Sequence, residues 1–162
     1  MDVQGVDKVR AFLDAQGYEG SIRHTEETIF TVEDASVAVG VAPDKILKSL
    51  IFLVNREPTL VLMSGSNKVA PKKIALAAGV SKSKIRMAQP EYVLETFGYR
   101  VGGVPPVGYD TLLPALIDQD IARFSVVWAA AGSDHDFFPI APDTLIAYTK
   151  GRMVDLKEDR VP

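Results

Sequence analysis

The sequence predicts one mixed α/β or α+β domain over residues 1–162, built on a largely antiparallel sheet. Three observations lead to this class. The length of 162 residues suits a single domain. Segments with helical spacing are mixed along the chain with segments rich in β-branched residues. Two of the apolar segments also lie close enough in the sequence to form a hairpin.

Five segments carry the signals of helices. Val6, Val9 and Leu13 are spaced like one face of an amphipathic helix, which Gly17 would end. Thr31 is suited to cap the next helix, because a hydroxyl at that position can accept from a free backbone amide. Further helices begin with proline, and glycine closes two of them. The helices after the first are expected over residues 32–39, 71–78, 90–97 and 142–148.

Apolar, β-branched segments predict the strands. Residues 49–54 and 59–63 are separated by Asn55, Arg56, Glu57 and Pro58, which predicts a hairpin with a loop of about four residues. Other strands are expected over residues 21–24, 112–117, 125–130, 137–140 and 152–156. Residues 98–108 fit neither class, since four glycines and two prolines there predict a shaped, irregular loop.

Composition excludes several kinds of chemistry. The chain has no cysteine, which rules out disulfides, thiolate metal sites and cysteine nucleophiles. It has no phosphate-binding P-loop, dinucleotide fingerprint, nucleophile elbow or HExxH motif. Neighbours such as Asp134, His135 and Asp136 point in different directions, so this triplet is expected to be a polar loop, and His24 a surface histidine. An enzyme of this sequence would have to use backbone groups, a lysine, water or the substrate itself.

Charge is unevenly distributed. The net charge is −3, but the six charged residues between Lys68 and Arg86 are all basic. This segment is either a solvated face or a phosphate contact, and patterning alone leaves both open. The N-terminus has no signal-peptide pattern and no apolar run reaches the length of a membrane span, so a soluble cytoplasmic protein is expected.

Two features remain as candidates for a site. Lys48 lies at the start of an apolar strand, where its charge must reach solvent or an anionic partner. The glycines of loop 98–108 allow close backbone approach to a ligand, and held amides can stabilise an oxyanion. Each has a structural alternative: Lys48 could extend to the surface, and the loop could be a rigid connector.

Four stretches of the sequence resemble the YbaK-like family of trans-editing proteins, which is related to the editing insertion of prolyl-tRNA synthetase. Each motif is short, but their order and spacing together are specific, and the resemblance covers roughly residues 20 to 155. The matching stretches are residues 31–36, residues 48–52, the loop 98–108 with Gly102 and Pro106 in register, and residues 131–133 followed by 142–145.

The resemblance implies a curved sheet flanked by helices and hydrolysis of the ester between an amino acid and the terminal adenosine of tRNA. It places Lys48 on the terminal phosphate or sugar and the backbone amides of Gly102 and Gly103 on the ester carbonyl, with water activated by a ribose hydroxyl. The residues it implies for substrate binding are Thr31, Pro106, Ser133, His135 and Asp136, and those for tRNA are Lys68, Lys72 and Lys73.

No cofactor and no metal ion are expected. The expected partners are the acceptor end of tRNA and an aminoacyl-tRNA synthetase, with no membrane and no DNA. Two alternatives stay open: a binding module of this fold that does not hydrolyse its ligand, and a scaffold domain in which Lys48→Ala would change only stability. Alanyl, cysteinyl, seryl and threonyl esters are the expected substrates, because a synthetase pocket discriminates poorly against small side chains.

Overall fold

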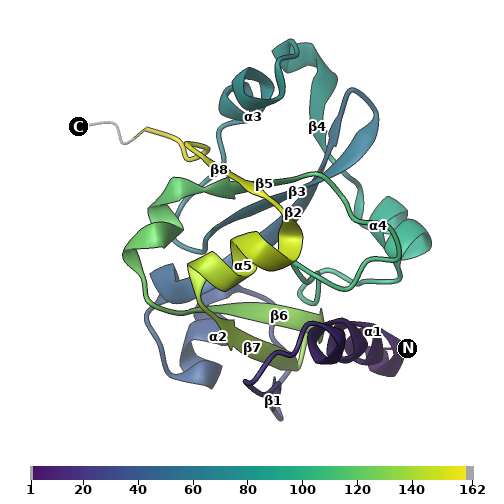
Figure 1. Cartoon of the computed structure of the whole chain (residues 1–162), viewed down its shortest axis with the longest axis vertical. Coiled ribbons are helices and arrows are strands. Elements are labelled where there is room, and N and C mark those ends of the chain that lie inside the picture. The colour runs from purple at the N-terminus through teal and green to yellow at the C-terminus, as the bar shows by residue number, and fades with distance from the viewer. Residues whose placement is uncertain (1, 160–162) are drawn as a thin grey trace.

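The computed structural model describes residues 2–159, which form one eight-stranded sheet with helices against it (Figure 1). The strands follow the order β1-β7-β6-β2-β3-β5-β8, and β4 pairs with β2 beside this path. The strands are β1 (Arg23–His24), β2 (Ile46–Val54), β3 (Glu57–Ser64), β4 (Ile85–Met87), β5 (Ala115–Asp118), β6 (Val127–Ser133), β7 (Asp136–Ile140) and β8 (Arg152–Val154). The helices are α1 (Asp2–Ala15), α2 (Val32–Val39), α3 (Pro71–Ala78), α4 (Pro90–Phe97) and α5 (Pro142–Thr149), with short 3₁₀ turns η1 (Pro43–Lys45), η2 (Lys82–Lys84) and η3 (Gln119–Arg123).

The sheet is mixed. Antiparallel pairs join β1 to β7, β2 to both β3 and β4, and β6 to β7. Parallel pairs join β2 to β6, β3 to β5, and β5 to β8. The predicted class, an α/β fold on a sheet in which antiparallel pairs predominate, is confirmed.

The helices begin and end where the sequence predicts. Thr31 caps α2 by accepting a hydrogen bond from the Asp34 amide at 3.0 Å. Gly40, Gly79 and Gly98 follow α2, α3 and α4 in the left-handed conformation, which glycine adopts without the strain of a Cβ atom.

The predicted four-residue hairpin loop is wrong. Asn55 and Arg56 alone form the turn, with φ angles of 50° and 74°, as the two central residues of a type I′ turn require. Glu57 and Pro58 belong to β3, where Pro58 stands opposite Leu53. Proline fits this end of the strand because the pairing of β3 with β5 begins only at Leu60, so no ladder hydrogen bond is lost.

Two further differences concern short elements. The three-residue strand β4 was not predicted, since it is too short to show an alternating pattern and two of its residues are exposed. Strand β5 begins at Ala115, three residues later than expected, while β6 continues to Ser133, three residues further than expected.

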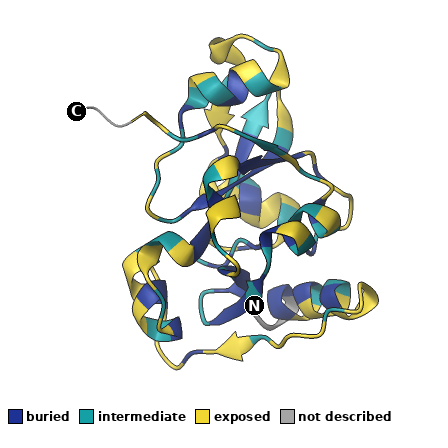
Figure 2. Ribbon diagram, turned by 60° about the vertical axis from the view of Figure 1, so that its left-hand side comes forward, coloured by how far each residue is buried: buried dark blue, intermediate teal, exposed yellow. Residues whose placement is uncertain are grey.

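The strand alternation divides the core between the two faces of the sheet. Leu47, Ile51 and Leu62 face α1 and α5, and Phe52 and Met63 face α3. Figure 2 shows the helices banded in buried and exposed residues, as expected of helices that pack on one side only. A third cluster, around Ile29, Ile46 and Phe137, holds α2 beside the end of β2.

Candidate active site

The sheet divides along one edge of β2. On that side β6 pairs only with Ile46 and Leu47, and β4 pairs only from Phe52 to Val54. Between these two pairings, no strand of residues 2–159 lies against residues 48–51. The opposite edge of β2 is paired with β3 from Leu47 to Val54. Residues 48–51 therefore form an open strand edge between two arms of the sheet.

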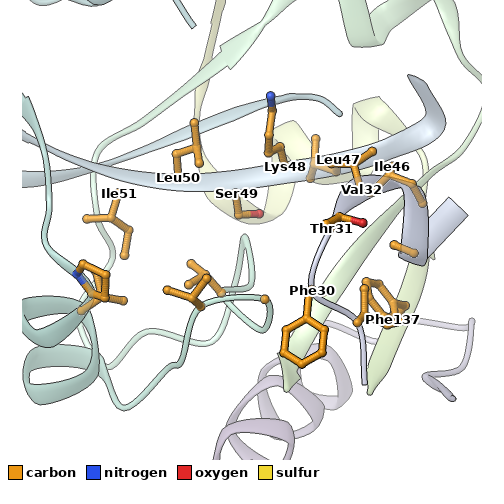
Figure 3. A pocket seen from close by; sticks show the side chains of 18 of the residues that line it. Phe30, Thr31, Val32, Ile46, Leu47, Lys48, Ser49, Leu50, Ile51 and Phe137 are labelled. Atoms are coloured by element: carbon orange, nitrogen blue, oxygen red, sulfur yellow. The ribbon is translucent and has the colours of Figure 1, made fainter. Parts of the chain in front are cut away.

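A cavity of about 360 Å³ lies at this open edge (Figure 3). Its walls come from β2, from α2 and the segment before it, from β4 and α4, from the glycine-proline loop, and from β6 and β7. Only three lining residues, Thr31, Lys48 and Ser49, have polar side chains. The others are Ile29, Phe30, Val32, Ala35, Ile46, Leu47, Leu50, Ile51, Met87, Ala88, Pro90, Val93, Val101, Gly102, Val104, Ala130 and Phe137. An apolar cavity of this size with few polar groups is typical of small-ligand sites.

Three apolar side chains at this cavity are exposed to solvent. Phe30 is 77% exposed, Val101 68% and Met87 49%. They come from three separate parts of the chain. Exposed apolar residues gathered around one opening are typical of a ligand-binding surface.

Lys48 and Ser49 point to opposite sides of β2 (Figure 3), as neighbouring residues in a strand do. Ser49 points into the cavity. Lys48 points the other way, and its Nζ donates a hydrogen bond to the carbonyl oxygen of Asn67. The side-chain amide of Asn67 in turn donates to Asp120 at 2.7 Å. The sequence led us to expect solvent or an anionic partner for the Lys48 charge, whereas its observed partner is a neutral backbone carbonyl, across β2 from the Ser49 hydroxyl.

The electrostatic environment of Lys48 is mixed. Partial burial lowers the pKa of Lys48 below the ordinary lysine value, because desolvation disfavours the charged form. Glu33 at the start of α2 opposes this shift, whereas Lys68 adds to it. An anionic group brought near Lys48 would restore its preference for the charged form.

The Ser49 hydroxyl is buried and has no hydrogen-bond partner within residues 2–159. A buried polar group without a partner destabilises the folded protein by about 1–3 kcal/mol relative to a satisfied one. Ser49 lies in the stretch 48–52 that resembles the family, but the sequence assigns it no role, since a serine in a strand gives no signal of its own. Its unpaired hydroxyl at the cavity makes Ser49 a candidate contact for a ligand.

The glycine-proline loop lies against two backbone segments and has no room for side chains at Gly102 and Gly103. A Cβ atom at Gly102 would lie 2.9 Å from the carbonyl oxygen of Ile29, and one at Gly103 would lie 2.7 Å from the Ser133 backbone. The Gly103 amide already donates to the Arg100 carbonyl oxygen at 2.9 Å, and Gly103 does not line the cavity. The prediction that both amides serve the ester is therefore corrected: the Gly102 amide remains as the loop's candidate donor.

Pro106 also lies away from the cavity. It is buried beside a second, much smaller cavity, which Phe12, Tyr109 and Tyr148 help to line. Its expected contact with the substrate is not supported by this position, and its fixed φ angle instead shapes the loop.

The residues predicted in the loop 132–136 bind one another. Ser133 donates to Asp136 at 2.6 Å, and Asp136 also accepts from His24 at 2.9 Å. The His135 amide donates to the Ser133 hydroxyl at 3.0 Å, and the His135 ring contacts Thr25 and Thr28. None of these side chains is among those that line the large cavity. In this conformation they support the turn beneath Gly103 instead of contacting a ligand.

The basic segment is only partly available to phosphates. Lys68 and Lys72 are exposed. Lys73 forms ion pairs with Asp155 and Asp159, both at 2.8 Å, and donates to the Lys157 carbonyl oxygen. The charge of Lys73 is thus already balanced by two carboxylates.

The described part of the chain holds neither a cluster of potential metal ligands nor a membrane-spanning helix. No group of three or more histidine, cysteine, aspartate or glutamate side chains in residues 2–159 could hold a metal ion. Within the same residues, no helix combines the length and the apolar character needed to cross a membrane.

Comparisons with known proteins agree on one family. The sequence profile of the aminoacyl-tRNA editing domain matches residues 26–148, a range that includes every residue lining the large cavity. A crystal structure of a proposed trans-editing enzyme for prolyl-tRNA synthetase superposes with a TM-score of 0.88 and 35% identity, over 96% of this chain and 98% of that one.

Two relatives add to this comparison. The proposed Cys-tRNA(Pro)/Cys-tRNA(Cys) deacylase EbsC of Enterococcus faecalis is 24% identical over 80% of this chain and 79% of its own length. The proline–tRNA ligase of Thermotoga maritima is 38% identical over 80 residues, which make up 49% of this chain and 14% of the ligase.

Proposed function

This chain belongs to the aminoacyl-tRNA editing domain family, and from that premise we propose that it hydrolyses the ester joining a wrongly attached small amino acid to the terminal adenosine of tRNA. Water adds to the ester carbonyl carbon, the ribose oxygen leaves with a proton, and free amino acid and tRNA result. The reaction would correct errors of a synthetase and so preserve the fidelity of translation.

The observation that carries this proposal is the cavity at the open edge of β2. It is lined by Ser49 and Lys48 of β2, by Thr31 before α2 and by Gly102 of the loop, and its other lining residues are apolar. It lies wholly within the residues that match the editing-domain profile. An apolar cavity with a few polar groups suits a small amino acid whose ester must be held in a fixed position.

The lining residues include no histidine, aspartate or glutamate. Ser49 consequently has no neighbouring base in the cavity that could activate it as a nucleophile. A water molecule activated by the free ribose hydroxyl of the substrate is the attacking group that these residues favour. The protein's part is then to position the ester and to stabilise the charge that develops on its carbonyl oxygen.

Two groups of the chain supply that stabilisation and positioning. Gly102 lines the cavity, and we assign its amide as a donor to the developing oxyanion. Removal of such a donor typically lowers the rate about a hundred- to a thousandfold. Lys48 is suited to bind the terminal phosphate or sugar of the tRNA from its side of β2, with Lys68 and Lys72 contacting phosphates further along the acceptor end.

The partners follow from the same proposal. The substrate is an aminoacyl-tRNA, and a prolyl-tRNA synthetase is the proposed source of the error, since relatives are named for that enzyme or are part of it. Alanyl, cysteinyl, seryl and threonyl groups are the proposed cargo, and the cytoplasm, where tRNA is charged, is the proposed location.

Deacylation of a panel of mischarged tRNAs tests the proposal. Wild type should release one or more of the four amino acids, and Lys48→Ala should lose at least about tenfold in rate, the usual scale for a charged hydrogen bond. Lys45→Ala, which removes an exposed lysine three residues earlier, is the matched control and should behave as wild type. Binding of tRNA without release of any amino acid would contradict hydrolysis and favour the non-catalytic binding module.

A further inference from the structure

We propose that the aminoacyl group binds as a one-residue antiparallel partner of Ser49, with its side chain beside the Ser49 hydroxyl. This inference rests on the proposed function and deepens it, because it assigns the residue that selects the amino acid. It follows from three observations: the side to which the backbone groups of Ser49 point, the chain direction of β2 along its open edge, and the unpaired Ser49 hydroxyl.

The backbone groups of Ser49 point into the gap between β6 and β4. The Ile46 carbonyl accepts from Gly65 at the end of β3, so the groups of residue 46 face the β3 side. The Ile51 carbonyl accepts from Ala88 at 2.9 Å, on the opposite side. Backbone groups alternate between the two sides of a strand. The N–H and C=O of Ser49 therefore face the open side, where no strand of residues 2–159 pairs with it.

An aminoacyl ester carries the groups that complete such a pair. In an antiparallel ladder, two opposed residues exchange both of their N–H to O=C hydrogen bonds. The α-ammonium of the ester can donate to the Ser49 carbonyl, and the ester carbonyl can accept from the Ser49 amide. A single residue can form both bonds with one strand residue only in the antiparallel orientation, since a parallel partner bonds to the two flanking residues.

The antiparallel orientation also fixes where the tRNA lies. β2 runs from Ile46 to Val54, so the ester end of the bound group points toward Ile46. Ile29 and Ile46 pack in one cluster, and a Cβ atom at Gly102 would lie 2.9 Å from the Ile29 carbonyl oxygen. The ester is thereby directed to the end of the cavity where Gly102 and exposed Phe30 lie. The Ser49 amide becomes a second donor to the oxyanion, in place of the Gly103 amide that is bonded to Arg100.

The same pairing places the side chain of the amino acid. Side chains of directly opposed residues lie on the same face of a sheet, about 5 Å apart at their Cβ atoms. The substrate side chain would thus lie next to the Ser49 Oγ, which is buried and lacks a partner within the described chain. A hydroxyl or thiol on the substrate can satisfy it, whereas an alanyl methyl group cannot. Seryl, threonyl and cysteinyl esters are therefore preferred to alanyl esters.

Binding of stable analogues tests this pairing without requiring hydrolysis. The probes are adenosines that carry L-serine or L-alanine through a 3′-amide, added to ¹⁵N-labelled full-length protein. We expect the Ser49 amide resonance to shift on binding, and the seryl analogue to bind about tenfold more tightly than the alanyl one, the scale of one neutral hydrogen bond. An analogue that shifts other cavity amides but leaves the Ser49 amide unchanged would overturn the backbone pairing.

The variant Ser49→Ala separates the two parts of the inference. It should bind the seryl and alanyl analogues equally and still show the shift of the residue 49 amide, because the backbone remains. Ser125→Ala, which changes an exposed serine outside the cavity, should keep the preference of wild type. Equal seryl preference in wild type and Ser49→Ala would show that the hydroxyl does not select the side chain.

Two further probes distinguish this inference from the proposed function. A lactyl analogue, in which a hydroxyl replaces the ammonium group, should bind at least about tenfold more weakly than the alanyl one. A D-seryl analogue should lose the preference over D-alanyl, because its side chain lies on the other face. Normal binding preferences without any deacylation would retain the Ser49 pairing and contradict only the hydrolysis. Deacylation by the wild type, with no shift of the Ser49 amide and no change of preference in Ser49→Ala, would support the hydrolysis and contradict the Ser49 pairing.

Discussion

The hydroxyls of Ser133 and Ser49, in two regions that the sequence marks as functional, have opposite environments. In the turn at residues 133–136, Ser133, His135 and Asp136 bond to one another and to the neighbouring strand. On the open edge of β2, the Ser49 hydroxyl is without a protein partner in the described part of the chain. The first arrangement is what a scaffold requires, and the second is what a binding site leaves for its ligand.

The difference implies that stability and specificity should separate between the two regions. Substitutions in the turn should lower the free energy of unfolding. Substitutions on the open edge should change which ligand is bound while leaving that free energy nearly unchanged. Four measurements examine this separation.

The largest effect is expected for Gly103→Ala, at the contact between the loop and the turn. The added Cβ atom would lie within 2.7 Å of two backbone atoms of Ser133, which cannot move independently of β6. We expect the free energy of unfolding in urea to fall by about 1–3 kcal/mol, the range for overpacked sites. An unchanged unfolding midpoint would show that the loop does not rest on the turn.

A similar or slightly smaller loss is expected for Ser133→Ala. This hydroxyl donates to the Oδ2 atom of Asp136 and accepts from the His135 amide, so its removal would take away a hydrogen bond from both groups. We expect a loss of about 1–3 kcal/mol in the same measurement. The preference between seryl and alanyl analogues should remain that of wild type, since Ser133 does not line the cavity. A changed preference would place the turn in the binding site after all.

The matched change on the open edge is Ser49→Ala, which also removes one serine hydroxyl. Because that hydroxyl has no partner in the described chain, its removal should leave the free energy of unfolding unchanged or raise it by up to about 1 kcal/mol. Thermal and urea unfolding beside Ser133→Ala provide the test. A loss as large as that of Ser133→Ala would mean that Ser49 is structural.

The smallest effect is a pH dependence from Lys48. Burial lowers the pKa of Lys48 below its ordinary value of 10.5, so the unfolded chain binds this proton more tightly than the folded one. Lys48 therefore opposes folding at neutral pH, and this opposition disappears as the pH rises through the folded pKa toward 10.5. Relative to Lys48→Met, wild type should gain stability as the pH is raised from neutral. A stability difference that does not vary with pH would contradict the shift.

The sequence predicted the helices, the hairpin strands and the family because these depend on local signals. Thr31, Gly79 and Gly98 mark helix ends by rules that act within a few residues. The open edge of β2 could not be predicted in this way. It exists because β6, about eighty residues later, pairs with only two residues of β2.

The site residues show the same limit. Lys48 and Gly102 line the cavity as their neighbouring motifs suggest. Gly103 looks equivalent to Gly102 in the sequence, yet its amide is used by Arg100 within the loop. Phe30 precedes a helix cap, where an apolar residue is ordinarily a packing contact, so its exposure could not be inferred. Which polar group is left without a partner is decided by tertiary structure.

The open edge of β2, between β6 and β4, has a consequence for the chain during its synthesis. The hairpin of β2 and β3, with α3, β4 and α4, contains one wall of the cavity and is complete once residue 97 has been made. The opposite wall needs Ala130 and Phe137, from β6 and β7. A nascent chain that has formed only the first half of the fold thus exposes the edge of β2 without the wall that β6 and β7 provide. The cavity, and any selectivity that it confers, is acquired only when the last third of the protein leaves the ribosome.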